Sequence, residues 1–234
     1  FKRMTDDATR WGAPFAALLG AYDAQLGFGL GSIGGKDSMS GTFNDEKHGE
    51  IHVPPTLVSF TVDVASSRDI ITPEFKRPGS KIVVFRAERD AYDLPVYDRI
   101  MEGYQKLHKD IQAGRILSAY GVERHGIAEA VSKMAFGNRL GLKIEHHVDP
   151  RDFFGAGWGD IVCEVPDGKV GELAMTYTLI GEVTDRPVFQ YGSVEIALDE
   201  AWESWTKPLE RVFPTRSGVK QDPVPDQVYK ADHV

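Results

Sequence analysis

The sequence contains a single cysteine, Cys163, among 234 residues, so no disulfide framework can form. This scarcity is typical of a reducing compartment, and we expect the protein in the cytoplasm. Cys163 lies in an alternating apolar segment, where cysteine usually serves as a small buried hydrophobic residue. We therefore do not expect Cys163 to act as a nucleophile.

Long apolar runs and blocks of like charge are also absent from the sequence. No stretch approaches the length of a membrane span, and no signal peptide is recognisable. Acidic residues outnumber basic ones by 35 to 27, and the resulting net charge of −8 is dispersed along the chain. This balance argues against a general role in binding nucleic acid or a membrane surface.

The spacing of the apolar residues predicts a mixed α/β (α+β) fold. In the first part of the chain we expect a helix with one apolar face over 11–27, a polar loop over 44–52 and a half-buried strand over 56–64. Farther along, strands are predicted over 81–86, 116–120, 161–165 and 178–183, and helices over 95–107, over 126–136 and around Trp202 and Trp205. Residues 193–197 are expected to begin the last ordered stretch.

The segment 66–80 contains two prolines and a glycine and is predicted to link two units. The first unit comprises residues 1–72 and the second unit residues 80–213. A polar tail, residues 214–234, contains two prolines beyond Pro214 and is expected to be flexible. One helix and a few strands cannot cover both faces of a sheet, so the first unit is incomplete by itself.

The segment GGKDSMSGTF, residues 34–43, concentrates functional groups at an expected strand end. Two adjacent glycines let the backbone turn and approach a ligand closely. A cation, a carboxylate and hydroxyl groups follow, which suits a phosphorylated or metal-bound ligand. The ligand-binding residues predicted here are Gly35, Lys36, Asp37, Ser38 and Ser40.

This segment has two other interpretations, a Walker A motif and a solvated turn. It is not a Walker A motif, because Asp37 follows Gly35-Lys36 where that motif has Ser or Thr. The alternative to ligand binding is a solvated turn in which Asp37 and Ser38 only cap the backbone.

GGKDSMSGTF resembles a signature of phosphoribosylformylglycinamidine (FGAM) synthase, and three further blocks resemble the same region in the same order. These blocks are residues 10–33, 53–64 and 130–142. The resemblance implies the C-terminal half of a duplicated synthetase core in the aminoimidazole ribonucleotide synthetase superfamily. The first unit would be the end of an ATPase-type domain, and the second unit the C-terminal α/β domain of that superfamily. The chain begins without a methionine and is expected to be a fragment that lacks the glutaminase domain.

The resemblance also implies a reaction for the parent enzyme, a ligase of purine biosynthesis. ATP, with Mg²⁺, would phosphorylate the formamide oxygen of formylglycinamide ribonucleotide, and ammonia from glutamine would displace the phosphate, leaving ADP. The implied partners are that nucleotide, ATP, the first-half synthetase domains and the glutaminase domain. The cysteine and histidine of the glutaminase are not in this chain, so the isolated chain is expected to be inactive.

A second candidate loop is GVERHG, residues 121–126, before a predicted helix. In many relatives the matching loop resembles DRSDGG, whose first Asp takes a metal. That Asp is replaced by Gly121, which argues against an auxiliary magnesium–nucleotide site. Arg124 and His125 are then candidates for binding phosphate at the helix N-terminus, with a solvent-facing turn as the alternative.

Other features give no metal site. His146 and His147 are adjacent and would point to opposite faces of a strand, and no cluster with ligand spacing completes a site. Asp37 is thus the one metal candidate.

The alternative to the synthetase interpretation is a purely architectural half that binds no ligand, which the altered GVERHG loop favours and the intact GGKDSMSG loop opposes. A stand-alone relative, such as aminoimidazole ribonucleotide synthetase or selenophosphate synthetase, fits the fold but not the four blocks. The unpaired apolar face of the first unit also predicts self-association, as a homodimer.

Overall fold

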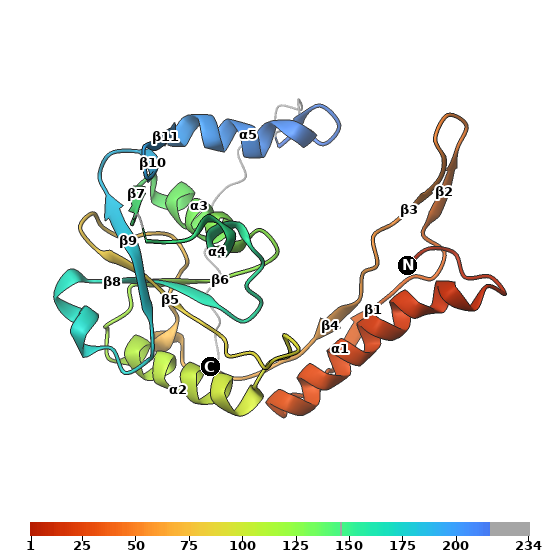
Figure 1. Cartoon of the computed structure of the whole chain (residues 1–234), viewed down its shortest axis with the longest axis horizontal. Coiled ribbons are helices and arrows are strands. Elements are labelled where there is room, and N and C mark those ends of the chain that lie inside the picture. The colour runs from red at the N-terminus through yellow and green to blue at the C-terminus, as the bar shows by residue number, and fades with distance from the viewer. Residues whose placement is uncertain (146, 216–234) are drawn as a thin grey trace, which may run out of the picture.

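The computed structural model describes residues 1–145 and 147–215 and has the predicted mixed α/β fold (Figure 1). His146 and residues 216–234, most of the tail for which flexibility was predicted, lie outside the described residues. Within the described part, none of the helices is both long enough and apolar enough to cross a membrane.

The second unit is built around a seven-stranded sheet in the order β11-β10-β7-β9-β5-β8-β6. Neighbouring strands are antiparallel except β7 and β10, which are parallel. The strands are β5 (Lys81–Phe85), β6 (Ser118–Gly121), β7 (Gly141–Ile144), β8 (Ile161–Val165), β9 (Thr178–Thr184), β10 (Val188–Tyr191) and β11 (Val194–Ala197). A strand is present at each of the four places predicted beyond residue 80, and the stretch predicted to begin at 193 starts with β11.

Helices cover both faces of this sheet (Figure 1). They are α2 (Tyr97–Gln112) on one face, and α3 (Gly126–Asn138), α4 (Pro150–Phe154) and α5 (Leu198–Glu210) on the other. Along β5, Ile82 and Val84 belong to the core under α3, whereas Val83 and Phe85 belong to the core under α2. This double burial explains why β5 is an uninterrupted apolar run.

The core of the second unit begins inside the predicted linker. Phe75 is fully buried, and its N–H donates to the carbonyl of Met134 on α3 at 2.9 Å. The next two N–H groups, of Lys76 and Arg77, donate to the buried Glu164 carboxylate on β8 at 2.7 and 3.1 Å. The chain from Phe75 onward is thus fixed to the second unit.

The first unit is extended (Figure 1). Its elements are the short 3₁₀ helix η1 (Ala8–Trp11), α1 (Gly12–Phe28), β1 (Gly34–Lys36), β2 (Thr42–Asp45), β3 (Gly49–His52), β4 (Val58–Phe60) and the 3₁₀ turn η2 (Ser67–Asp69). The 3₁₀ helix η3 (Asp167–Glu172) belongs to the second unit. Helix α1 confirms the helix predicted over 11–27, but none of its residues is buried. Its apolar face is open to solvent, as Phe15 at 61% and Leu26 at 65% exposure show.

Two predictions for the first unit were wrong. Residues 44–52 are not a loop but contribute most of the hairpin of β2 and β3. The Asp45 carboxylate closes its turn by accepting the N–H groups of Lys47 and His48 at 2.7 and 2.9 Å, and Gly49 adopts a φ of 74°. The strand predicted over 56–64 is shortened to β4, which is exposed on both faces rather than half-buried.

Candidate functional site

The segment 34–43 begins in strand β1 and continues as a loop, so the predicted position at a strand end is confirmed. β1 pairs antiparallel with β4, with Gly35 opposite Ser59 and Lys36 opposite Val58. A Cβ at Gly35 would overlap the carbonyl oxygen of Val58. Glycine at this position therefore lets two strand backbones approach each other, a role that needs no ligand.

Lys36 and Ser38 lie together in the loop. The Lys36 ammonium donates to Ser38 Oγ at 2.9 Å and to the carbonyl of Asp37. Both side chains are exposed, which leaves the ammonium and the hydroxyl accessible to an anionic ligand. Ser40 lies farther along the same loop and is also exposed.

The start of the chain holds this loop from the other side. The Phe1 nitrogen donates to the carbonyl of Ser38 at 2.6 Å, and the Phe1 carbonyl accepts the N–H of Gly41 at 2.8 Å. The N–H of Met4 donates to the carbonyl of Met39 at 3.3 Å. The loop backbone is thus fixed by hydrogen bonds, while the Lys36 and Ser38 side chains are not buried.

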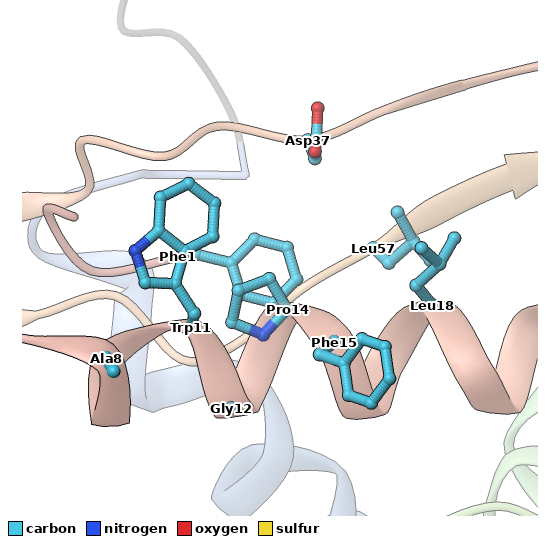
Figure 2. A pocket seen from close by; sticks show the side chains of 9 residues that line it. All are labelled: Phe1, Ala8, Trp11, Gly12, Pro14, Phe15, Leu18, Asp37 and Leu57. Atoms are coloured by element: carbon cyan, nitrogen blue, oxygen red, sulfur yellow. The ribbon is translucent and has the colours of Figure 1, made fainter.

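A groove runs between α1 and the strands β1 and β4. One part of it, about 510 Å³ in volume, is lined by Phe1, Ala8, Trp11, Gly12, Pro14, Phe15, Leu18, Asp37 and Leu57 (Figure 2). A second part, about 290 Å³, shares Leu18, Asp37 and Leu57 with the first and is also lined by Gln25, Ser32 and Lys36. Figure 2 shows Asp37 across the groove from the rings of Trp11 and Phe15. The groove therefore joins an apolar wall to a charged rim.

Asp37 is the one predicted metal candidate, and it stands without a ligand cluster. Among the described residues, no group of three or more His, Cys, Asp or Glu is arranged to hold a metal ion. A single carboxylate still fits the way Mg²⁺ is usually bound, with one or two carboxylates and the remaining ligands from phosphate and water.

The second candidate loop, 121–126, connects β6 to α3, as predicted. Arg124 and His125 are exposed, and neither lines the groove beside α1. The His125 N–H is 3.3 Å from the Glu129 carboxylate, which therefore already occupies part of the helix N-terminus. The pKa of Glu129 is lowered, chiefly by the hydrogen bond from Lys133. This carboxylate therefore stays charged and disfavours a second anion at the helix N-terminus.

The other residues singled out in the sequence, Cys163 and His147, belong to the second unit and do not line the groove. Cys163 is completely buried, as predicted, and burial raises the pKa of its thiol to about 12. His147 Nε2 lies 3.0 Å from the carbonyl oxygen of Leu179. Two features of the groove were not predicted: its apolar wall, formed by Trp11 and Phe15, and the contact of Gln25 with Ser32. No spacing rule in the sequence relates the side chains of α1 to the segment that follows the helix.

No family model matches the chain. A structure of PurLQS from Thermotoga maritima covers 75% of this chain with 33% of its own length, at 15% identity and a TM-score of 0.50. Over this part, the chain shares the fold of PurL. Two further matches are phosphoribosylformylglycinamidine synthase II from T. maritima, at 14% identity over 74% of this chain and 32% of its own with a TM-score of 0.49, and T. maritima PurL complexed with ATP, at 15% over 75% and 32% with a TM-score of 0.47. The chain thus spans about a third of the length of these solved structures.

Proposed function

We propose that this chain is part of an FGAM synthase, a cytoplasmic ligase of purine biosynthesis that uses ATP and glutamine. The observation that carries the proposal is the set of four sequence blocks in register; in one of them, GGKDSMSGTF, residues 34–37 line a groove in the structure. The PurL fold of the chain supports it. Residues 1–72 would be the end of the ATPase-type domain, residues 80–213 the C-terminal α/β domain, and residues 214–234 a connector.

The loop supplies the chemistry that a phosphorylated ligand requires. Lys36 neutralises phosphate charge, and the hydroxyls of Ser38 and Ser40 donate hydrogen bonds to phosphate oxygens. Gly35 keeps the strand backbone close to β4, so that Lys36 is presented at the rim of the groove. Asp37 would hold Mg²⁺, which would supply positive charge against the phosphoryl oxygens. Arg124 and His125, the other phosphate candidates, lie on the second unit beside the charged Glu129 carboxylate, so they would add at most a weak contact with phosphate.

The proposed parent enzyme needs two partners besides this chain. Glutamine hydrolysis needs the glutaminase domain, and the ATPase-type domain needs the first-half synthetase as its partner. The isolated chain is therefore catalytically silent. Its exposed α1 face, with Phe15, Leu18 and Leu26 open to solvent, drives self-association into a homodimer at high concentration.

Calorimetric titration of the chain with Mg-ADP, Mg-ATP and formylglycinamide ribonucleotide tests this proposal. We expect saturable binding of at least one ligand, weakened tenfold or more by Asp37→Ala, about 1.4 kcal/mol or greater. Asp6→Ala is the matched control, because Asp6 is an exposed carboxylate of the first unit that lines neither part of the groove. Equal loss of affinity in both variants would reject the role of Asp37.

A second candidate function is an architectural half that binds no ligand. The observation that favours it is the open apolar side of α1, which suits a packing surface better than a nucleotide site. The architectural role would be selected if none of the three ligands binds to this chain and none binds at this loop in the intact enzyme.

A further inference from the structure

The carboxyl end of α1 is one of the places where the first unit contacts the second. The Phe28 ring packs edge-on against Tyr97 at the start of α2, with 4.9 Å between centroids, and lies parallel to Tyr104 at 6.3 Å. Tyr97 Oη donates to the Asp23 carboxylate at 2.6 Å. A Cβ at Gly27 would overlap the Tyr97 ring, so glycine permits the close approach of α1 to α2.

The same end of α1 holds the segment that leads into β1. Gln25 Oε1 accepts the N–H of Ser32 at 2.9 Å, and Gln25 Nε2 donates to the carbonyl of Ala21 at 3.2 Å, which orients the amide. Ser32 Oγ is 2.8 Å from the carbonyl of Gly34 in β1 and 3.1 Å from that of Phe60 in β4. Contacts thus continue from α2 through α1 to both strands of the candidate site.

These contacts matter because little else fixes α1. The helix has no buried residue, so no core packing sets its position. Gln25 and Ser32 also line the groove beside Lys36 and Asp37, which means that a shift of the helix end changes the groove directly.

We propose that Tyr97 is a positioning residue for the loop at 36–40: it holds the carboxyl end of α1, and Gln25 and Ser32 transmit that position to β1. The expected effect on ligand affinity rests on the proposed function. The link from Tyr97 through Gln25 and Ser32 to β1 does not depend on it. Desolvation, and next Asp23, raise the pKa of Tyr97 to about 12, so the hydroxyl keeps the proton that it donates at neutral pH.

Amide hydrogen exchange at short labelling times tests the link in the chain itself. Tyr97→Phe removes only the hydroxyl, and Gln25→Ala removes the acceptor of the Ser32 N–H. In both variants we expect exchange over residues 32–36 to accelerate about fivefold, as the loss of one net hydrogen bond implies. Asp23→Asn keeps an acceptor oxygen for Tyr97 and should exchange like the wild type, whereas Asp23→Ala should behave like Tyr97→Phe.

Gln112→Ala is the matched control. Gln112 Nε2 also joins the two units, by a 3.0 Å hydrogen bond to Asp69, but that bond ends far along the chain from α1. Exchange over 32–36 should not change in this variant. Unchanged exchange in Tyr97→Phe and Gln25→Ala, or an equal increase in Gln112→Ala, would overturn the proposal.

Titration with Mg-ADP separates this inference from the proposed function. If the wild type binds, Tyr97→Phe should weaken binding about fivefold without changing the melting temperature of the second unit. Equal affinity of wild type and Tyr97→Phe would overturn the positioning role and leave the proposed function standing. If the wild type binds no nucleotide, the proposed function loses its support and the exchange experiment alone decides the link.

Discussion

Two buried carboxylates hold irregular segments of the second unit in place. Glu164 accepts hydrogen bonds from the N–H groups of Lys76 and Arg77 and from Ser118 Oγ. Asp110 pairs with Arg115 at 2.7 Å and accepts the N–H groups of Ala174 and Met175, each at 3.0 Å. Both carboxylates satisfy backbone donors that have no strand or helix partner, which explains how charged residues can be buried here.

Glu164→Gln should destabilise the chain by about 2–4 kcal/mol, because the amide NH₂ must face at least one of the donors that the carboxylate accepts. Chemical denaturation measures this change. Glu172→Gln is the control: Glu172 forms an exposed pair with Lys169 at 2.9 Å, and its loss should change stability by less than about 1 kcal/mol. Equal effects of the two substitutions would contradict the role assigned to Glu164.

Cys163 should not react with a thiol reagent in the native chain. Its side chain is completely buried and burial raises its pKa to about 12, so neither access nor thiolate is available near pH 8. Labelling with iodoacetamide, followed by mass spectrometry, should give no adduct natively and one adduct after denaturation. Rapid native labelling at a rate independent of denaturant would contradict the buried placement.

The burial of Cys163 was predictable from the alternation of its neighbours, whereas that of Glu164 was not. Alternation assigns residues 161–165 to a strand, and the apolar neighbours on both sides then place Cys163 inside. Glu164 lies in the same strand, but it carries a charge, and alternation does not predict that a charged residue is buried. Its burial depends on backbone donors 87 and 88 residues earlier in the chain, a separation that no local pattern encodes.

At the scale of the elements, prediction succeeded where one periodicity extends over a long segment. α2 and α3 carry helical apolar faces that pack on the sheet, and both were predicted, although α2 continues to Gln112. β7, β10 and α4, which are 4, 4 and 5 residues long, were missed, whereas β6, also 4 residues long, was predicted from a brief apolar run. The hairpin of β2 and β3 was missed because its polar residues and glycine matched a loop pattern.

Gly126, at the start of α3, should be intolerant of a side chain. Its φ is 73°, and an added Cβ would lie 2.5 Å from the carbonyl oxygen of Gly155, a backbone atom that cannot rotate away. We expect Gly126→Ala to destabilise the second unit by about 2–4 kcal/mol, measured by thermal or urea unfolding.

Gly168→Ala is the control for this prediction. Gly168 lies in η3 with no atom within 4 Å of an added Cβ, and it is not among the positive-φ residues. Its substitution should change stability by less than about 1 kcal/mol. A Gly126→Ala variant as stable as Gly168→Ala would show that α3 can begin without the left-handed residue.

At the scale of the whole molecule, the candidate site was predictable only on its loop side. The proximity of Lys36 and Ser38 is local, since a single residue separates them, and the sequence already grouped them. The opposite wall comes from Trp11 and Phe15, more than twenty residues earlier in the chain. The position of α1, on which this wall depends, is set in part by its contact with α2. Those contacts are long-range, so the groove itself could not be foreseen.

The two units should differ in stability, and urea should open the first at a lower concentration than the second. α1, β1 and β4 have no buried residue, and each exposed Leu or Phe forgoes about 1.5–3 kcal/mol that burial would supply. The second unit, in contrast, has apolar cores on both faces of its sheet. Pulse proteolysis in increasing urea should therefore remove the first unit and leave a resistant fragment that begins shortly before Phe75, whose buried ring and backbone hydrogen bond to Met134 anchor the start of that unit. Loss of α1 and β8 at the same urea concentration would mean instead that α1 is stabilised by a partner surface, such as a second copy, and dilution would then separate the two transitions.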